Sequence, residues 1–183
     1  MFAPNNVDYV PITLAVSLCG AKLSPVNPLY KPRELSTIMN QCRAEVLVVH
    51  SKLIDVALEA MNDSPKCKHI VVISDPAQEG GQFIPEGAVG LDDLKVHDSP
   101  LTKTVNKLHN GDTSAHPFLL PFSSGTTGLP KAVCLSHENI VAQLLQYDQV
   151  EAPGFPSVSY VNYYELIIFI GIIMMSKISF EVL

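Results

Sequence analysis

The chain has 183 residues, of which 47% are hydrophobic and 16% are charged, so we expect it to fold around one sizeable core rather than to remain disordered. Its net charge of −6 offers no basic surface for nucleic acid. The four cysteines form no C-x-x-C pair and the six histidines show no ligand spacing, which predicts buried, reduced thiols and no metal site.

The first predicted element is a helix over Val7–Cys19. Asn6 or Asp8 is a suitable N-cap, and Gly20 is expected to end the helix. Apolar residues occur nearly all the way round this helix, which predicts burial on several sides.

Strands and helices then alternate along the chain. A helix is predicted over Lys31–Cys42, followed by a strand over Glu45–His50, a helix over Lys52–Met61 capped by Ser51, and a strand over His69–Ser74. The strands are continuously apolar, as is typical of strands buried on both faces. The pattern predicts the α/β class, with a parallel sheet and flanking helices.

Residues 75–115 contain several glycines and prolines and many polar residues, and we interpret them as a long surface connection with one helical turn at Gly90–Leu94. An apolar strand, Phe118–Phe122, follows the connection. After a polar loop, Ser123–Lys131, a second apolar run covers Ala132–Leu135. Ser136 is expected to cap a final helix that ends near Tyr147 and turns Ile140, Val141, Leu144 and Leu145 toward the core.

The loop between the two apolar runs has the chemistry of a phosphate site. Gly125 and Gly128 allow successive backbone N–H groups to turn toward one anion, and Lys131 adds a positive charge. Hydroxyl donors come from Ser123, Ser124, Thr126 and Thr127. The spacing is not that of a Walker A loop, because only two residues separate the glycines and Ala132 follows the lysine. The alternative is a surface loop that binds no ligand, which the two prolines, the lysine and the flanking strands make the weaker interpretation.

The segment Ser123-Ser-Gly-Thr-Thr-Gly-Leu-Pro-Lys131 resembles the signature loop of the AMP-forming adenylating enzymes, which include acyl-CoA and coumarate-CoA ligases, luciferases and peptide-synthetase adenylation domains. The similarity runs from about Phe2 to about Tyr147 and includes Phe2-Ala-Pro-Asn-Asn and the Asn27-Pro-Leu-Tyr turn. The resemblance implies that residues 1–150 are part of the large N-terminal domain of such an enzyme. Residues 151–183 form a divergent apolar tail.

The resemblance implies an ATP-dependent acid–CoA ligase, which joins a carboxylate to AMP and then transfers the acyl group to a thiol. ATP, Mg²⁺ and coenzyme A would be its cofactors, and a carboxylic acid, fatty or aryl, its substrate. The ATP phosphates would contact Ser123, Ser124, Gly125, Thr126, Thr127, Gly128 and Lys131. We assign no catalytic residue, because the family's downstream tyrosine-glycine-x-threonine-glutamate motif and its catalytic lysine are absent from this sequence.

Those absences, together with a start at Met1-Phe2-Ala3-Pro4 where family members are already at a strand end, suggest a family member shortened at both ends, so whether the chain is itself an enzyme is left open. The alternative hypothesis is a non-catalytic truncated isoform or fragment that acts, if at all, by binding a partner. A peptide-synthetase adenylation domain is a third and weaker possibility.

The apolar tail is densest from Leu166 to Met175, about half of the ~20 residues that a membrane helix needs. We therefore favour a buried strand or helix over a membrane segment for residues 158–175. Met1-Phe2-Ala3-Pro4-Asn5 lacks the positive start of a signal peptide, so a cytoplasmic or peroxisomal location is expected.

Overall fold

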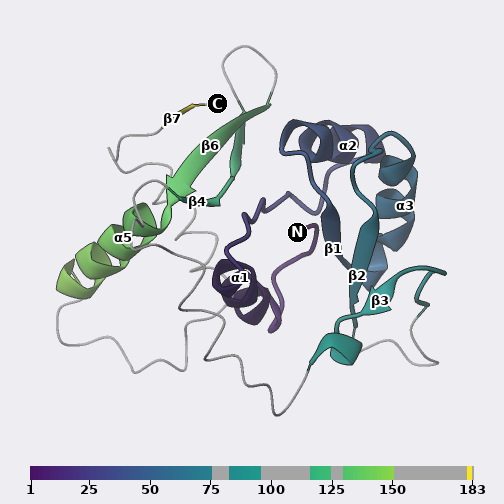
Figure 1. Ribbon diagram of the computed structural model, residues 1–183, viewed down its shortest axis with the longest axis horizontal. Helices are drawn as coiled ribbons and strands as arrows, with labels where there is room; N and C mark the ends of the chain where they lie inside the picture. Colours follow the sequence, from purple (N-terminus) through teal and green to yellow (C-terminus); the bar gives the residue numbers. More distant parts are fainter. Residues whose placement is uncertain (76–82, 96–115, 125–129, 151–180, 183) are drawn as a thin grey trace.

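The computed structural model describes residues 1–75, 83–95, 116–124, 130–150 and 181–182 (Figure 1). The apolar tail and the proposed boundary near residue 150 therefore lie almost wholly outside the described residues. In chain order the elements are α1 (Tyr9–Leu18), α2 (Pro32–Gln41), β1 (Val46–His50), η1 (Ser51–Leu53), α3 (Ile54–Asn62), β2 (His69–Ile73), β3 (Val89–Gly90), η2 (Asp92–Leu94), β4 (Pro117–Leu119), β5 (Phe122–Ser124), β6 (Pro130–Ser136), α5 (His137–Val150) and β7 (Glu181–Val182).

The predicted parallel sheet is confirmed. β1 and β2 pair in parallel from Val46↔His69 to His50↔Ile73, with α3 as the crossover between them. β3 continues the sheet in parallel beside β2, at Val71↔Val89. The helical turn expected at Gly90–Leu94 is confirmed as η2, but the strand before it was not expected, because two residues are too short to show a periodic pattern.

Two short extended segments join this sheet to the C-terminal strands. Phe2 lies between Val49 and Val26 and bridges both in parallel, and its N–H group donates to the Val48 carbonyl oxygen across 2.8 Å. Leu23 in turn bridges Leu119 of β4. β4 and β5 both pair with β6 in antiparallel register, and β7 pairs with the same strand. The strands thus form one continuous hydrogen-bonded surface.

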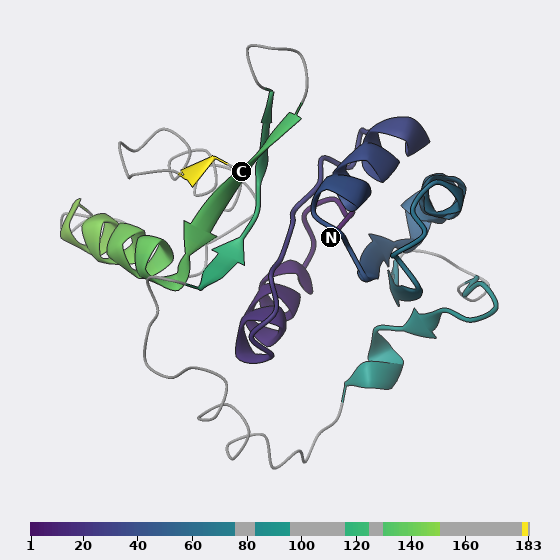
Figure 2. The same ribbon diagram turned by 45° about the horizontal axis from the view of Figure 1, so that its top comes forward.

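Helices cover both faces of this surface, and the alternation of side chains along β1 shows the division. Leu47 and Val49 pack with α2 and α3, whereas Val48 packs with the cluster that contains α1 and the start of α5. Figures 1 and 2 show α1 between the parallel strands and the β4–β6 hairpin. The arrangement is therefore helix–sheet–helix, as the alternating pattern predicted.

The ends of the helices follow local chemistry, with one correction. Gly20, at a φ of 67°, ends α1 as expected. Ser51 does not cap the helix after β1. Instead the His50 Nδ1 accepts the Lys52 N–H group across 3.3 Å, and the Ser51 hydroxyl is buried without a hydrogen-bond partner. The chain enters a 3₁₀ turn at Ser51, so the capping position moves back by one residue.

The expected burial of α1 and α5 is partly wrong. α1 buries Tyr9 and Ile12 but exposes Val10, Leu14 and Leu18. On α5, Ile140 packs against the core as expected. Val141 and Leu145, however, are 53% and 59% exposed. Among the described side chains, each helix therefore leaves large apolar residues exposed that the sequence pattern had placed in the core.

The cysteines also differ from expectation in one respect. All four are free thiols, as predicted, and Cys67 is buried. Cys42 and Cys134 are partly buried, whereas Cys19 is exposed because it lies beyond the last turn of α1. Among the described helices, none combines the length and the apolar character required to cross a membrane.

Candidate phosphate-binding hairpin

The signature segment forms an antiparallel hairpin. Phe122 pairs with Ala132, Ser123 with Lys131, and Ser124 with Pro130. Three of the predicted phosphate ligands, Ser123, Ser124 and Lys131, therefore belong to the strands and lie at the end of the hairpin next to the loop. The other four, Gly125, Thr126, Thr127 and Gly128, lie outside the described residues.

Lys131 is exposed on β6. Within the described part of the chain its ammonium group forms no ion pair, whereas Lys52 and Lys95 are both paired with aspartates. An unpaired ammonium beside a glycine- and hydroxyl-rich loop is available to an anion. The role of Lys131 as a phosphate ligand stays a prediction.

The strand on the N-terminal side of the loop is fastened to the rest of the sheet. Leu23 donates its N–H group to the Phe118 carbonyl oxygen and accepts from the Leu120 N–H group, both across 2.8 Å. The Ser24 hydroxyl donates to the Leu120 carbonyl oxygen across 3.0 Å. These bonds hold the strand before the loop in a fixed position relative to the parallel strands.

The other side of the hairpin is held at its base. The Ser136 hydroxyl accepts the Asn139 N–H group, and the Asn139 side chain accepts the Ser136 N–H group, so the two residues form a reciprocal cap on α5. The predicted capping role of Ser136 is confirmed. The His137 ring stacks on the buried Phe118 ring, with centroids 4.9 Å apart. Rigid supports therefore flank the loop on both strands.

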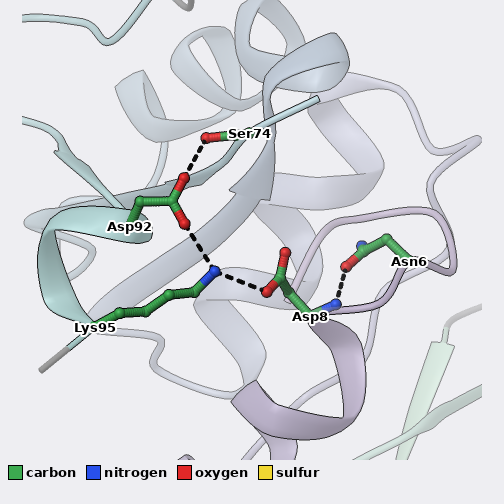
Figure 3. A network of polar contacts seen from close by, with 5 residues as sticks. All are labelled: Asn6, Asp8, Ser74, Asp92 and Lys95. Carbon is green, nitrogen blue, oxygen red and sulfur yellow. Dashed lines mark hydrogen bonds and ion pairs between the residues drawn. The ribbon is translucent and has the colours of Figure 1, made fainter. Parts of the chain in front are cut away.

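A polar network that we did not predict lies where β2 and β3 end (Figure 3). The Lys95 ammonium contacts Asp92 across 2.7 Å and Asp8 across 3.1 Å, and the Ser74 hydroxyl donates to Asp92 across 3.2 Å. The hydrogen bond from Lys95 holds the pKa of Asp92 below its usual range, and the same bond raises the pKa of Lys95. The sequence did contain one signal for this network. Ser74 and Asp92 each follow one of two successive parallel strands, and the carboxyl ends of such strands meet at one edge of a sheet.

A second charged pair lies at the same edge. Lys52 contacts Asp75 across 2.6 Å, close to the buried His50. Burial lowers the pKa of His50; Asp75 opposes this shift and Lys52 adds to it. In both groups the lysine is already paired with aspartate, so we interpret them as structural contacts that hold the edge together rather than as ligand sites.

Metal binding has no candidate among the described residues, since no group of three or more His, Cys, Asp or Glu side chains is placed to hold an ion.

The parallel sheet covered by helices, with the signature hairpin beside it, is the fold of the N-terminal domain of adenylating enzymes. The chain matches solved structures of acetoacetyl-CoA synthetase from Streptomyces lividans (TM-score 0.65, 23% identity, 80% of this chain and 23% of that one) and of a long-chain-fatty-acid-CoA ligase from Archaeoglobus fulgidus (TM-score 0.56, 28% identity, 80% and 26%). The first of these supports the fold alone.

The chain belongs to the AMP-binding enzyme family, whose model matches residues 1–176. It is 31% identical over 166 residues to a probable 4-coumarate–CoA ligase of Dictyostelium discoideum, covering 83% of this chain and 28% of that protein. It is 29% identical to a 4-coumarate–CoA ligase of Pinus taeda, covering 84% and 26%. The chain is thus a member of the acid–CoA ligase family that spans about a quarter of the length of the relatives it matches.

Proposed function

We propose that the hairpin loop from Ser123 to Lys131 binds the β- and γ-phosphates of ATP. The observation that carries this proposal is the exposed Lys131, which forms no ion pair with any described residue and which β6 carries beside the Ser/Thr/Gly loop. The hydroxyls and backbone N–H groups of residues 123–128 would complete the contacts. Preorganised donors of this kind neutralise charge that develops on a leaving pyrophosphate.

In the reaction that we propose for the whole ligase, a carboxylate oxygen of the acid attacks the α-phosphorus of ATP. The bond from that phosphorus to the bridging oxygen breaks, and pyrophosphate leaves with the bonding electrons. A thiolate, which we propose to be that of coenzyme A, then attacks the acyl carbon and releases AMP. The relatives are named for coumarate, fatty acid and acetoacetate substrates, so we assign no acid to this chain.

We further propose that this chain by itself binds nucleotide but does not complete adenylation. The support is its extent, because it spans about a quarter of its relatives and lacks the downstream family motifs. The assay is ATP–pyrophosphate exchange with a panel of fatty and aryl acids, and we expect no exchange above background. Clear exchange that Lys131→Ala abolishes would show that the chain is a complete catalyst.

Nucleotide binding is tested separately by calorimetric titration of the folded chain with ATP and with pyrophosphate. Loss of a charge-assisted contact costs about 1.5–3 kcal/mol, so Lys131→Ala should weaken binding by about tenfold or more. Lys66→Ala is the matched control, because Lys66 is also exposed but lies in the turn before β2 and not on the hairpin. A folded wild-type chain that binds neither ligand would refute the proposal.

A further inference from the structure

The strand that leads into the hairpin loses a backbone hydrogen bond on its β6 side. Leu119 pairs with Leu135 of β6 and bridges Leu23 in parallel on its other side. Two residues later, the Pro121 carbonyl oxygen accepts the Val133 N–H group across 2.8 Å. Proline has no N–H group, so Pro121 cannot return the second bond of an antiparallel pair. The attachment of the strand to β6 is therefore weakened between β4 and β5.

The other side of the same strand lacks a backbone bond for the same reason. Leu23 donates its N–H group to the Phe118 carbonyl oxygen and accepts the Leu120 N–H group, which is the parallel pattern. The next bond of that pattern would run from the N–H group of residue 25 to the Leu120 carbonyl oxygen. Residue 25 is a proline. The Leu120 carbonyl oxygen therefore lacks the backbone donor that a regular ladder would supply.

The Ser24 hydroxyl takes the place of that missing donor. Ser24 is partly buried, and its hydroxyl donates to the Leu120 carbonyl oxygen across 3.0 Å, a normal hydrogen-bond length. The N–H group of Val26 faces the other way and donates to the Met1 carbonyl oxygen across 2.9 Å. A side chain thus completes the parallel ladder at a position where the backbone cannot.

The position of this bond matters for the residues that follow it. Pro121 comes directly after Leu120, and Phe122 then begins β5, which pairs with β6 through Ser123↔Lys131. Without the Ser24 bond, the strand would have weakened attachments on both sides at residues 120–121. The hairpin could then turn about these two residues, and the exposed Lys131 would move with it.

We propose that Ser24 is a positioning residue for phosphate binding by the hairpin, an inference that rests on the function proposed above. Ser24 acts through Leu120 and holds the hairpin, with Lys131, in one orientation relative to the parallel strands. When the arrangement that binds is only partly populated, the apparent affinity falls by that fraction. The free energy of one hydrogen bond limits the effect, so loss of the Ser24 hydroxyl should weaken binding by about twofold to tenfold.

Calorimetric titration of the full chain with ATP and with pyrophosphate tests the proposal. Ser24→Ala should bind both ligands about twofold to tenfold more weakly than the wild type, and Ser24→Thr, which keeps a hydroxyl, should restore the affinity. Ser36→Ala is the matched control. The Ser36 hydroxyl also donates to a backbone carbonyl oxygen across 3.0 Å, that of Arg33, but within α2, so its loss should leave both affinities unchanged.

Pro25→Ala distinguishes positioning from a general loss of stability. In the Ser24→Ala background this substitution returns an N–H group to the ladder position that faces the Leu120 carbonyl oxygen, so the double variant should recover affinity. Pro25→Ala alone completes the double-mutant cycle. Hydrogen exchange reports the same junction without ligand: the Leu120 and Val133 amides should exchange faster in Ser24→Ala and more slowly again in the double variant. Unchanged protection of β1 and β2 shows that each variant is folded.

The outcomes separate this proposal from the proposed function. A folded wild-type chain that binds neither ATP nor pyrophosphate would refute both. If the wild-type chain binds and folded Ser24→Ala binds equally well, the positioning role is refuted while phosphate binding by the hairpin stands. The same conclusion follows if Pro25→Ala does not restore the affinity that Ser24→Ala has lost.

Discussion

The Ser24 hydroxyl donates a hydrogen bond to the Leu120 carbonyl oxygen across 3.0 Å, and the two residues are 96 positions apart in the sequence. Leu23, next to Ser24, bridges Leu119 in the same place. This junction connects the parallel strands, which form from nearby residues, to the hairpin that carries the signature loop. The position of the loop relative to the parallel sheet therefore depends on contacts between distant parts of the chain.

Ser24→Ala should lower the free energy of unfolding by about 1 kcal/mol, the usual net value of one hydrogen bond that is lost from a folded protein. Urea unfolding of the wild-type and variant chains measures the change. Thr37→Ala is the control, since the Thr37 hydroxyl bonds to the Arg33 carbonyl oxygen within its own helix and should contribute less. Equal losses of unfolding free energy in the two variants would show that the long-range hydrogen bond of Ser24 contributes no more than one within a helix.

Gly20→Ala should destabilise the chain by about 1–2 kcal/mol, because Gly20 has a φ of 67° and a β-carbon is unfavourable in that conformation. The same backbone conformation allows the Ala21 N–H group to reach the Val16 carbonyl oxygen at the end of α1. Gly20→Asn should cost clearly less, since asparagine tolerates the left-handed region better than alanine does. Thermal or urea unfolding measures the stability of the two variants. Equal losses of stability for Gly20→Ala and Gly20→Asn would contradict the explanation from the left-handed conformation of Gly20.

The stability should decrease when the pH falls below about 6.5, the usual pKa of histidine. Burial lowers the pKa of His50 in the folded chain, so the unfolded chain binds more protons in the window just below that value. Unfolding measured in urea between about pH 8 and about pH 5 should show this decrease. His50→Asn should remove part of the decrease while still accepting the Lys52 N–H group, whereas His69→Asn, at an exposed position, should leave it unchanged.

Lys95→Met should have only a small effect on stability, and that effect should diminish as salt is added. The ammonium of Lys95 joins Asp92 to Asp8 at an exposed position, where ion pairs are weakly stabilising and screened. Because the pKa of Asp92 is lowered, its contribution is present above about pH 3.8 and is lost as the pH falls through the lowered value. A large loss of stability in Lys95→Met that does not change with salt would contradict the interpretation of this network as an exposed, weakly stabilising contact.

Local sequence patterns were sufficient for much of this molecule. The stripe of Leu35, Ile38 and Met39 predicts a helix, and the structure buries all three residues on α2. The run of branched residues in β1 and β2 predicts parallel strands, and these strands pair over their full length. Ser136 was identified as a cap from its place before a helical pattern. For the helix and the cap, the deciding interaction lies within a few residues of the pattern. For the two strands it lies across a single crossover helix.

Other features depended on which element packs against which. The sequence by itself predicted a helix over Val7–Cys19, which the structure places at Tyr9–Leu18, and its apolar residues on all sides predicted burial. Only the tertiary structure decided that one side of this helix would be left exposed. It likewise determined a glycine- and hydroxyl-rich loop, but the pairing of Leu23 with Leu119 decided where the hairpin lies. The reason is physical: backbone periodicity reflects neighbours three or four residues away, whereas the burial of a face depends on a partner that can be a hundred residues distant.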